Sequence, residues 1–270
     1  MSRTSKKKRS SSSDSFNPNR VVMNVVESSG SEQDWSFGDA LSARVIPRRE
    51  PVPESVDLRA RWWRVQNQGE TGACVGYATA YGLLWRQGVT AGKISTKQMP
   101  SARFIWMANK ETDGLTARPS TFLEKAPTQT KSALRIAAKY GCVLDRDLPM
   151  KGSLSNLEEN EFYSRASRLK VASYFNLGRN VEDWKRWLAF RGPILTRLVP
   201  DPQFLAPRGV LDRYVFSGLK GGHAVCLAGY TSDTLIVRNS WGRSWGKRGY
   251  VEVSLDYAKQ AFTEAYGAMM

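Results

Sequence analysis

Apolar residues recur at helical spacing in the first two thirds of the chain and gather in short runs after that. Four segments have the spacing of helices: 75–85, 101–109, 131–140 and 181–190. The first is apolar on nearly every side, which predicts a helix buried in the middle of a lobe, with Cys74 at its start. A fifth, polar segment at 158–168 has weak helical character. The Gly192-Pro193 pair ends the last helix, because proline cannot continue one.

Beyond Pro193 the pattern changes to short β-type runs separated by Gly, Asp and Ser. These runs are 194–199, 224–230, 235–239 and 249–253. Early helices and late strands predict an α+β protein of two lobes, not an alternating α/β sheet. We expect a helical lobe over 51–165 and a β-rich lobe over 166–270.

Residues 1–50 are expected to lie outside these lobes. Residues 1–19 are rich in Ser and Lys and almost without apolar side chains, so they predict a disordered basic tail. This tail can be an arm for localisation or for binding an anionic partner, or simply a solubilising terminus. Prolines 47, 51 and 53 then indicate an extended approach to a folded part that starts near Val52. A second polar loop is expected over 112–130.

Size and charge narrow the class of protein. A chain of 270 residues with 41% hydrophobic content can bury a core without a metal or a crosslink. The formal net charge of +15 extends beyond the tail and favours association with acidic proteins, nucleic acid or a membrane surface. No stretch approaches the ~18 apolar residues of a membrane span.

Cysteine and histidine usage argues against a crosslinked or zinc-binding protein. Cys74, Cys142 and Cys226 form an odd set without framework spacing, which favours a reducing compartment, and we expect a cytoplasmic protein, with non-classical export left open. Lys6–Arg9 runs into serines and not into the apolar core of a signal peptide. One histidine and no CxxC pair cannot supply the usual zinc ligands, so neither metal nor cofactor is expected.

The single histidine, His223, indicates thiol chemistry when it is considered with three other residues. A cysteine becomes a thiolate at a helix start or beside a cationic imidazole, and Cys74 meets the first condition. Asn239 offers an amide oxygen that can hold an imidazole in one orientation. Gln68, in the turn before Cys74, can donate to a developing oxyanion together with the Cys74 backbone N–H.

At these residues the chain resembles the papain-like cysteine peptidases, especially the shorter bacterial members. The resemblance runs from about 56 to 251 and is most specific in the segment Asn-Ser-Trp-Gly at 239–242, followed by Trp245-Gly246 and Gly249-Tyr250. The histidine lies within, and the asparagine somewhat beyond, the separation of roughly 130–150 residues from the cysteine that is usual in this family.

The resemblance implies both a fold and a set of roles. The fold is α+β and two-lobed, with a helical N-terminal lobe, a β-rich C-terminal lobe and the active-site cleft between them. The activity is that of a cysteine-type peptidase that cleaves protein or peptide substrates through a thioester. Cys74 would be the nucleophile, His223 the base and acid, Asn239 the orienting residue, Gln68 the oxyanion donor and Trp241 the ring that shields the histidine–asparagine bond.

Three departures from the family pattern affect what we expect. Thr71 and Val75 replace the first cysteine and the aromatic residue of the family signature. The sequence Ala-Pro-Thr-Gln at 126–129 replaces the paired glycines that offer backbone to an extended peptide, and Pro127 has no N–H, so the substrate edge is expected to be altered. The segment before Val52 does not resemble a long helical inhibitory propeptide, so control by a large zymogen domain is not expected.

Two other functions remain open from the sequence. A thiol-dependent acyl transferase or amidase could use the same fold and nucleophile. A catalytically silent module could bind peptide or nucleic acid through the basic surface. Cys142 and Cys226 are interpreted as core thiols in every case.

Overall fold

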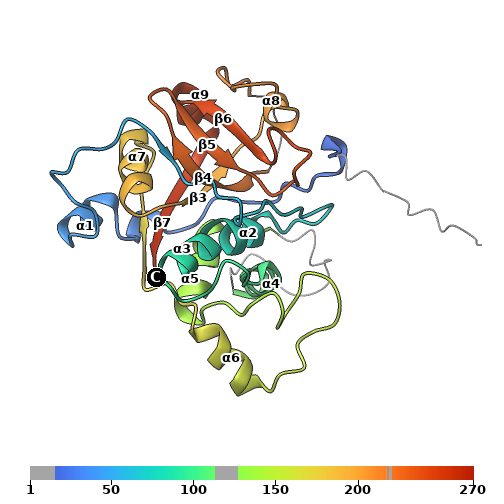
Figure 1. The fold of residues 1–270 in the computed structure, drawn as a ribbon. Helices are drawn as coiled ribbons and strands as arrows, with labels where there is room; N and C mark the ends of the chain where they lie inside the picture. Colours follow the sequence, from blue (N-terminus) through green and yellow to red (C-terminus); the bar gives the residue numbers. More distant parts are fainter. Residues whose placement is uncertain (1–15, 113–126, 217, 219–220) are drawn as a thin grey trace, which may run out of the picture.

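The computed structural model describes residues 16–112, 127–216, 218 and 221–270. A group of helices lies against one side of an antiparallel sheet, and other helices cover the far side of the sheet (Figure 1). The predicted tail over 1–15 and most of the predicted polar loop lie outside the described residues.

The helical part is built around one long buried helix. It begins at Cys74 and runs through α2 (Cys74–Tyr77), the π-helical η3 (Ala78–Leu84) and α3 (Trp85–Thr90). Gly82 lets this helix approach the sheet, because a Cβ there would lie 2.8 Å from the Cβ of Cys226. The neighbouring helices are α4 (Ala102–Thr112), α5 (Thr130–Lys139) and α6 (Glu159–Ser167). The helices predicted here are confirmed. Their ends are shifted by one to three residues, except that the long helix runs to Thr90, five residues beyond its predicted end.

The described strands form a single antiparallel sheet in the order β2-β7-β3-β4-β5-β6, and β1 pairs with β4. Their bounds are β1 (Val56–Asp57), β2 (Ser173–Asn176), β3 (Ile194–Leu198), β4 (His223–Tyr230), β5 (Thr234–Arg238), β6 (Tyr250–Ser254) and β7 (Phe262–Met269). The register places Leu198 opposite His223 and Cys226 opposite Arg238. The four predicted strands are present, and β1, β2 and β7 are additional.

Two cores follow from this arrangement. One lies between the helices and the near face of the sheet. The other lies on the far face, where α7 (Val181–Phe190), α8 (Pro202–Leu205) and α9 (Leu255–Ala261) cover the strands. β1 comes from the expected helical lobe, 51–165, yet it pairs with β4 of the β-rich lobe, so the two lobes share the sheet. In the described part of the chain no helix combines the length and apolar character that crossing a bilayer requires.

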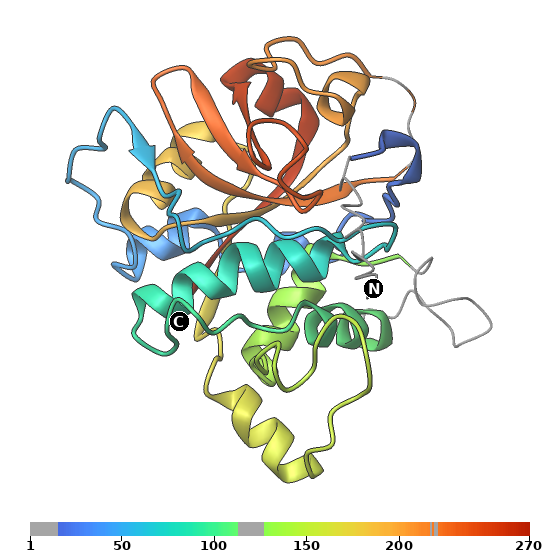
Figure 2. The same ribbon diagram turned by 45° about the vertical axis from the view of Figure 1, so that its right-hand side comes forward.

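The prediction that the folded part starts near Val52 is wrong. Residues 16–50 pack along the molecule and contain η1 (Pro18–Arg20), η2 (Ser31–Gln33) and α1 (Phe37–Ser42). Val25, Phe37, Ala40 and Ile46 are buried. Phe37 and Ala40 have helical spacing, but α1 is only six residues long, and Val25 and Ile46 lie far from it, so the sequence pattern did not reveal the segment. Figure 2 shows it passing between the sheet and the helices.

Candidate active site

His223 and Asn239 are brought together by neighbouring strands. His223 begins β4, Asn239 follows β5, and His223 Nε2 lies 2.7 Å from Asn239 Oδ1. The backbone N–H of Ser240 also donates to Asn239 Oδ1, at 2.7 Å. Because Oδ1 can only accept, the hydrogen of the neutral ring resides on Nε2. His223 Nδ1 is therefore left with its lone pair, and it has no hydrogen-bond partner among the described residues.

Aromatic rings enclose this pair. Trp241 stacks on the imidazole with ring centroids 4.4 Å apart, and Phe204 meets both rings edge-on. The His223 side chain is fully buried. Burial lowers the pKa of His223 to about 4, and the hydrogen bond to Asn239 opposes that shift only in part. The imidazole is thus held neutral in this covered state.

Cys74 is the first residue of the long helix and is also fully buried. Its helix, α2, packs against β4, the strand that begins with His223. The oriented peptide groups of a helix favour negative charge at its N-terminal end. Cys74 therefore combines a thiolate-favouring position with packing against the histidine strand.

The turn before Cys74 is fastened to the residues that follow Asn239. Gln68 N donates to Ser240 O at 2.8 Å, and Ser240 Oγ donates to Gln68 Oε1 at 2.6 Å. Gln68 Nε2 donates to Thr71 O at 2.7 Å, which leaves its second hydrogen for another acceptor. Asn67 pairs with Trp241 as an isolated bridge. The structure thus links Gln68 directly to the asparagine segment.

Residues 16–28, which we call the strap, cross this site. Val25 exchanges two backbone hydrogen bonds with Gly222, the residue before His223, at 3.1 and 2.9 Å. On its other side, Thr128 N donates to Asn24 O and Thr128 O accepts from Val26 N. Residues 24–26 of the strap therefore pair with Gly222 on one side and with Thr128 on the other. His223 and Cys74 are both fully buried in this arrangement.

Side chains also hold the strap in place. Phe16 stacks on Trp241 with centroids 5.0 Å apart. Glu27 pairs with Arg197 of β3 at 3.3 Å, and Ser28 donates through its N–H and its hydroxyl to Glu264 of β7. Two residues on strands of the sheet, Arg197 and Glu264, thus bind two consecutive residues of the strap.

The expected alteration of the substrate edge needs a correction. Pro127 has no N–H, but the neighbouring Thr128 presents both its N–H and its carbonyl group to the strap. An edge that pairs with an extended segment on both groups is therefore present despite the lost glycines.

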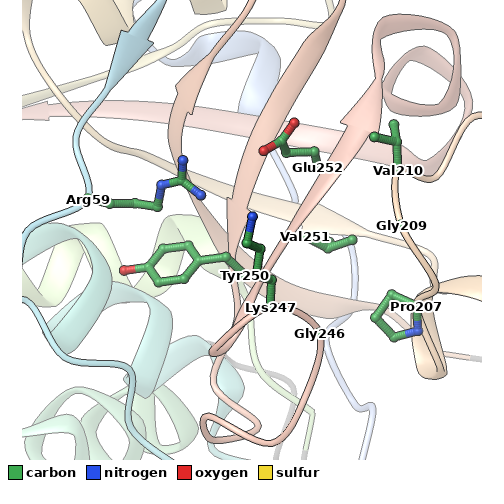
Figure 3. Close-up of a pocket in the computed structure, with 9 residues that line it drawn as sticks. All are labelled: Arg59, Pro207, Gly209, Val210, Gly246, Lys247, Tyr250, Val251 and Glu252. Atoms are coloured by element: carbon green, nitrogen blue, oxygen red, sulfur yellow. The ribbon is translucent and has the colours of Figure 1, made fainter.

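Cys142, Cys226 and a hollow of the β-rich lobe lie outside this site. Burial raises the pKa of the Cys226 thiol to about 12 and also raises that of Cys142. None of the three cysteines forms a disulfide. A hollow of about 530 Å³ is drawn in Figure 3, where the side chains of Arg59, Lys247 and Glu252 converge. Among the described residues, no group of three or more His, Cys, Asp and Glu is arranged to hold a metal.

Sequence reasoning missed three residues of the site. They are Ser240, which holds Gln68; Phe204, which packs on His223; and Arg197, which faces the strap. Ser240 carried a usable signal, because it lies within the Asn-Ser-Trp-Gly segment. Phe204 and Arg197 carried none, since Arg197 reaches the site through strand pairing and Phe204 through the short helix α8.

The chain matches the profile of the papain family of cysteine proteases over residues 127–267, more than half of its length. It is 25% identical over 215 residues to a cathepsin L-like proteinase of Fasciola hepatica, a match that covers 75% of this chain and 60% of the relative. It is 25% identical over 212 residues to macrodontain-1 of Ananas macrodontes, covering 76% and 90%. The chain thus spans less than two thirds of the Fasciola protein.

The fold matches the crystal structure of xylellain, a cysteine protease from Xylella fastidiosa. The TM-score is 0.75 at 18% identity, and the match covers 93% of this chain and 97% of that one. The predicted two-lobed papain-like fold is confirmed. The narrower expectation of a bacterial-type member is not supported, because the similar proteins also come from Fasciola and Ananas.

Proposed function

Since the chain belongs to the papain family of cysteine proteases, we propose that it hydrolyses peptide bonds with Cys74, His223 and Asn239 as its reacting and orienting residues. The observation that carries this proposal is the bond between His223 Nε2 and Asn239 Oδ1, which leaves Nδ1 as the basic nitrogen. A base of this kind is what a cysteine thiol needs in order to become a nucleophile.

The proposed reaction has two halves. His223 Nδ1 takes the Cys74 proton, and the sulfur attacks the peptide carbonyl carbon. The resulting oxyanion accepts from the Cys74 backbone N–H and from the free hydrogen of Gln68 Nε2. As the intermediate collapses, the leaving amine takes the proton from His223 and a thioester remains. Water, deprotonated by His223, then attacks the thioester, and Cys74 recovers its proton as the acid leaves.

We further propose that the strap keeps the site latent. Its backbone occupies hydrogen-bonding groups on Gly222 and Thr128 that an extended peptide substrate would need. The burial of His223 also disfavours the imidazolium form that stabilises a thiolate. The strap is a short segment that contains only the single turn η1, so it differs from a long helical inhibitory propeptide. Peptide hydrolysis thus requires the strap to leave the cleft.

The natural substrate is proposed to be a protein or peptide, and the location to be the cytoplasm. Three cysteines held as thiols support a reducing compartment. Separating cell fractions and probing for the chain tests this location. Recovery in an extracellular fraction would contradict it. Binding of an anionic partner by the tail remains a prediction, because residues 1–15 lie outside the described part.

The proposed activity is tested by comparing Cys74→Ala with Cys142→Ala on peptide substrates, after the strap has been displaced by limited proteolysis. We expect Cys74→Ala to abolish hydrolysis and Cys142→Ala to retain it. Adding an amine acceptor and identifying the products by mass spectrometry distinguishes hydrolysis from acyl transfer. Amide products in place of free acids would contradict a peptidase, as would hydrolysis by Cys74→Ala.

A further inference from the structure

A second site is indicated by a hollow that lies away from Cys74 and His223. It has a volume of about 910 Å³ and is formed where the segment after α1 meets the end of α7. We call it the arginine hollow, because Arg44, Arg48, Arg49 and Arg191 line it. In Figure 1, α1 and α7 lie together at the left of the molecule, on the side away from η1 of the strap.

The charge in this hollow is unbalanced. Glu50 is the one carboxylate among its described lining residues, against four guanidinium groups. In the described part of the chain, none of these four arginines forms an ion pair. The hollow of Figure 3 contrasts with it, since Arg59 there is held by Asp57 at 2.7 Å and Glu252 lines the same wall. Clustered cations without counter-charges attract an anion.

The hollow is held open by hydrogen bonds to the backbone of its own loop. Arg191 Nε donates to Val45 O. Arg186 Nη1 donates to Pro47 O at 2.8 Å and to Glu50 O at 3.0 Å. Arg186 in α7 and Arg191 at its end thus fix the course of residues 45–50. The side chains of Arg44, Arg48 and Arg49 remain exposed to solvent.

Arg44 occupies a position that usually favours glycine. It follows the end of α1 with a φ of 55°, in the left-handed region. A long side chain at such a position carries a conformational cost that glycine avoids. A contact between the Arg44 guanidinium and a ligand in the hollow would offset that conformational cost.

We propose that the arginine hollow binds the linked phosphate groups of a small polyphosphate-bearing molecule. The planar guanidinium fork matches phosphate oxygens in pairs, and several forks around one concave site suit adjacent phosphates. A single nucleic-acid strand would require aromatic platforms for its bases. Phe190 is the aromatic residue among the described lining residues, and the guanidinium of Arg186 already lies 5.8 Å from its ring centre.

This site is independent of the proposed peptidase activity. It shares no lining residue with the strap contacts or with the histidine–asparagine pair. The phosphates can come from an inorganic polyphosphate or from a nucleoside triphosphate. The common chemistry is the chain of phosphates, and the two sources are separated by whether the nucleoside adds affinity.

The test is calorimetric titration of the full chain with inorganic tripolyphosphate, adenosine triphosphate and citrate at two salt concentrations. The variant Arg44→Gly/Arg48→Ala/Arg49→Ala removes three guanidinium groups, and the glycine suits the backbone at position 44. The matched control Lys6→Ala/Lys7→Ala/Lys8→Ala removes the same charge from the tail. We expect the arginine variant to weaken tripolyphosphate binding at least tenfold and the lysine control to change it less than twofold.

A charge-retaining variant, Arg44→Lys/Arg48→Lys/Arg49→Lys, separates the fork from the charge, and circular dichroism checks that each variant is folded. We expect this variant to bind more weakly than the natural chain. Equal affinity for tripolyphosphate and adenosine triphosphate would show that the site recognises the phosphate chain alone. Tighter binding of adenosine triphosphate would show that the site also contacts the nucleoside. The proposal is overturned if tripolyphosphate does not bind, if citrate binds as tightly, or if the arginine variant binds normally.

Discussion

Asn239 Oδ1 lies 2.7 Å from His223 Nε2 and also accepts the backbone N–H of Ser240. The second contact identifies which amide atom faces the ring, because a backbone N–H can only donate. One asparagine oxygen therefore determines which nitrogen of the single histidine is basic. The proposed chemistry depends on this relationship more than on any other contact in the site.

Replacing Asn239 should leave the His223 imidazole in place but without the hydrogen bond that orients it. We expect Asn239→Ala to lower kcat/KM by about 10²-fold, within the roughly 10²–10⁴-fold that a positioned acid–base group contributes. Asn239→Asp keeps an acceptor at the same place and should retain the Nε2–H tautomer. Peptide hydrolysis rates together with ¹⁵N chemical shifts of the imidazole measure both effects. An unchanged rate and tautomer in Asn239→Ala would refute the orienting role.

Because the chain has one histidine, the protonation of His223 and its effect on stability can be measured without overlap from another imidazole. Burial lowers the pKa of His223 to about 4, so the unfolded chain binds a proton near pH 6.5 that the folded chain does not yet bind. The contribution of this ring to the free energy of unfolding is therefore fully present above about pH 6.5. It falls as the pH drops toward 4, by about 3 kcal/mol at most.

An NMR titration of the one imidazole signal tests this, with unfolding of His223→Gln as the control for carboxylate titration. The control should lose less stability than the natural chain between pH 6.5 and 4. A histidine pKa near 6.5 in the intact chain would contradict the burial of His223.

Breaking the strap's backbone pairing should open the site. Val25→Pro removes the N–H that Val25 donates to Gly222 O, and we expect a several-fold higher rate of peptide hydrolysis and of Cys74 alkylation by the full chain. Val21→Pro is the matched control, because Val21 has a φ of −78° that already suits proline. Equal rates in both variants would show that the Val25 pairing does not limit access.

Gly76 tests the packing that positions the cysteine helix. A Cβ at this position would lie 2.5 Å from Ala102 O and 2.8 Å from Trp106 Cβ, so Gly76→Ala should destabilise the fold by about 1–3 kcal/mol, although alanine favours helices. Gly38→Ala, in α1, meets an atom no closer than 3.4 Å and should be neutral or slightly stabilising. Urea unfolding of both variants measures the difference. Equal stabilities would contradict close packing between α2 and α4.

The sequence predicted the elements whose apolar residues are regularly spaced. The long helix after Cys74 is of this kind, and the strand at 224–230 was found as a nearly unbroken apolar run between polar residues. β7 was missed, because its apolar residues are interrupted by Thr263, Glu264 and Gly267. Gly267 is required there by packing, since a Cβ would overlap the ring of Trp187. A long-range contact of this kind leaves no local period.

The candidate residues were found from their order and their local motifs, and the strap was not. Gln68, Cys74, His223 and Asn239 each lie in a short segment with a chemical reason for its residue types. The strap is defined by pairing with Gly222 and Thr128, which are distant in the chain. Its own sequence, Val-Val-Met-Asn-Val-Val at 21–26, shows neither helical nor alternating spacing. Pairing between distant segments can be inferred only when the partner is known.

The most direct test of the central claim is to capture the acyl-enzyme. A slowly hydrolysed peptide ester is added to the strap-opened chain, and the modified residue is identified by peptide mass mapping. We predict a thioester on Cys74 that is lost in His223→Gln, with Cys142 and Cys226 unmodified, because burial raises the pKa of both of those thiols. Acylation at either of those cysteines, or full acylation of Cys74 without His223, would contradict the proposed site.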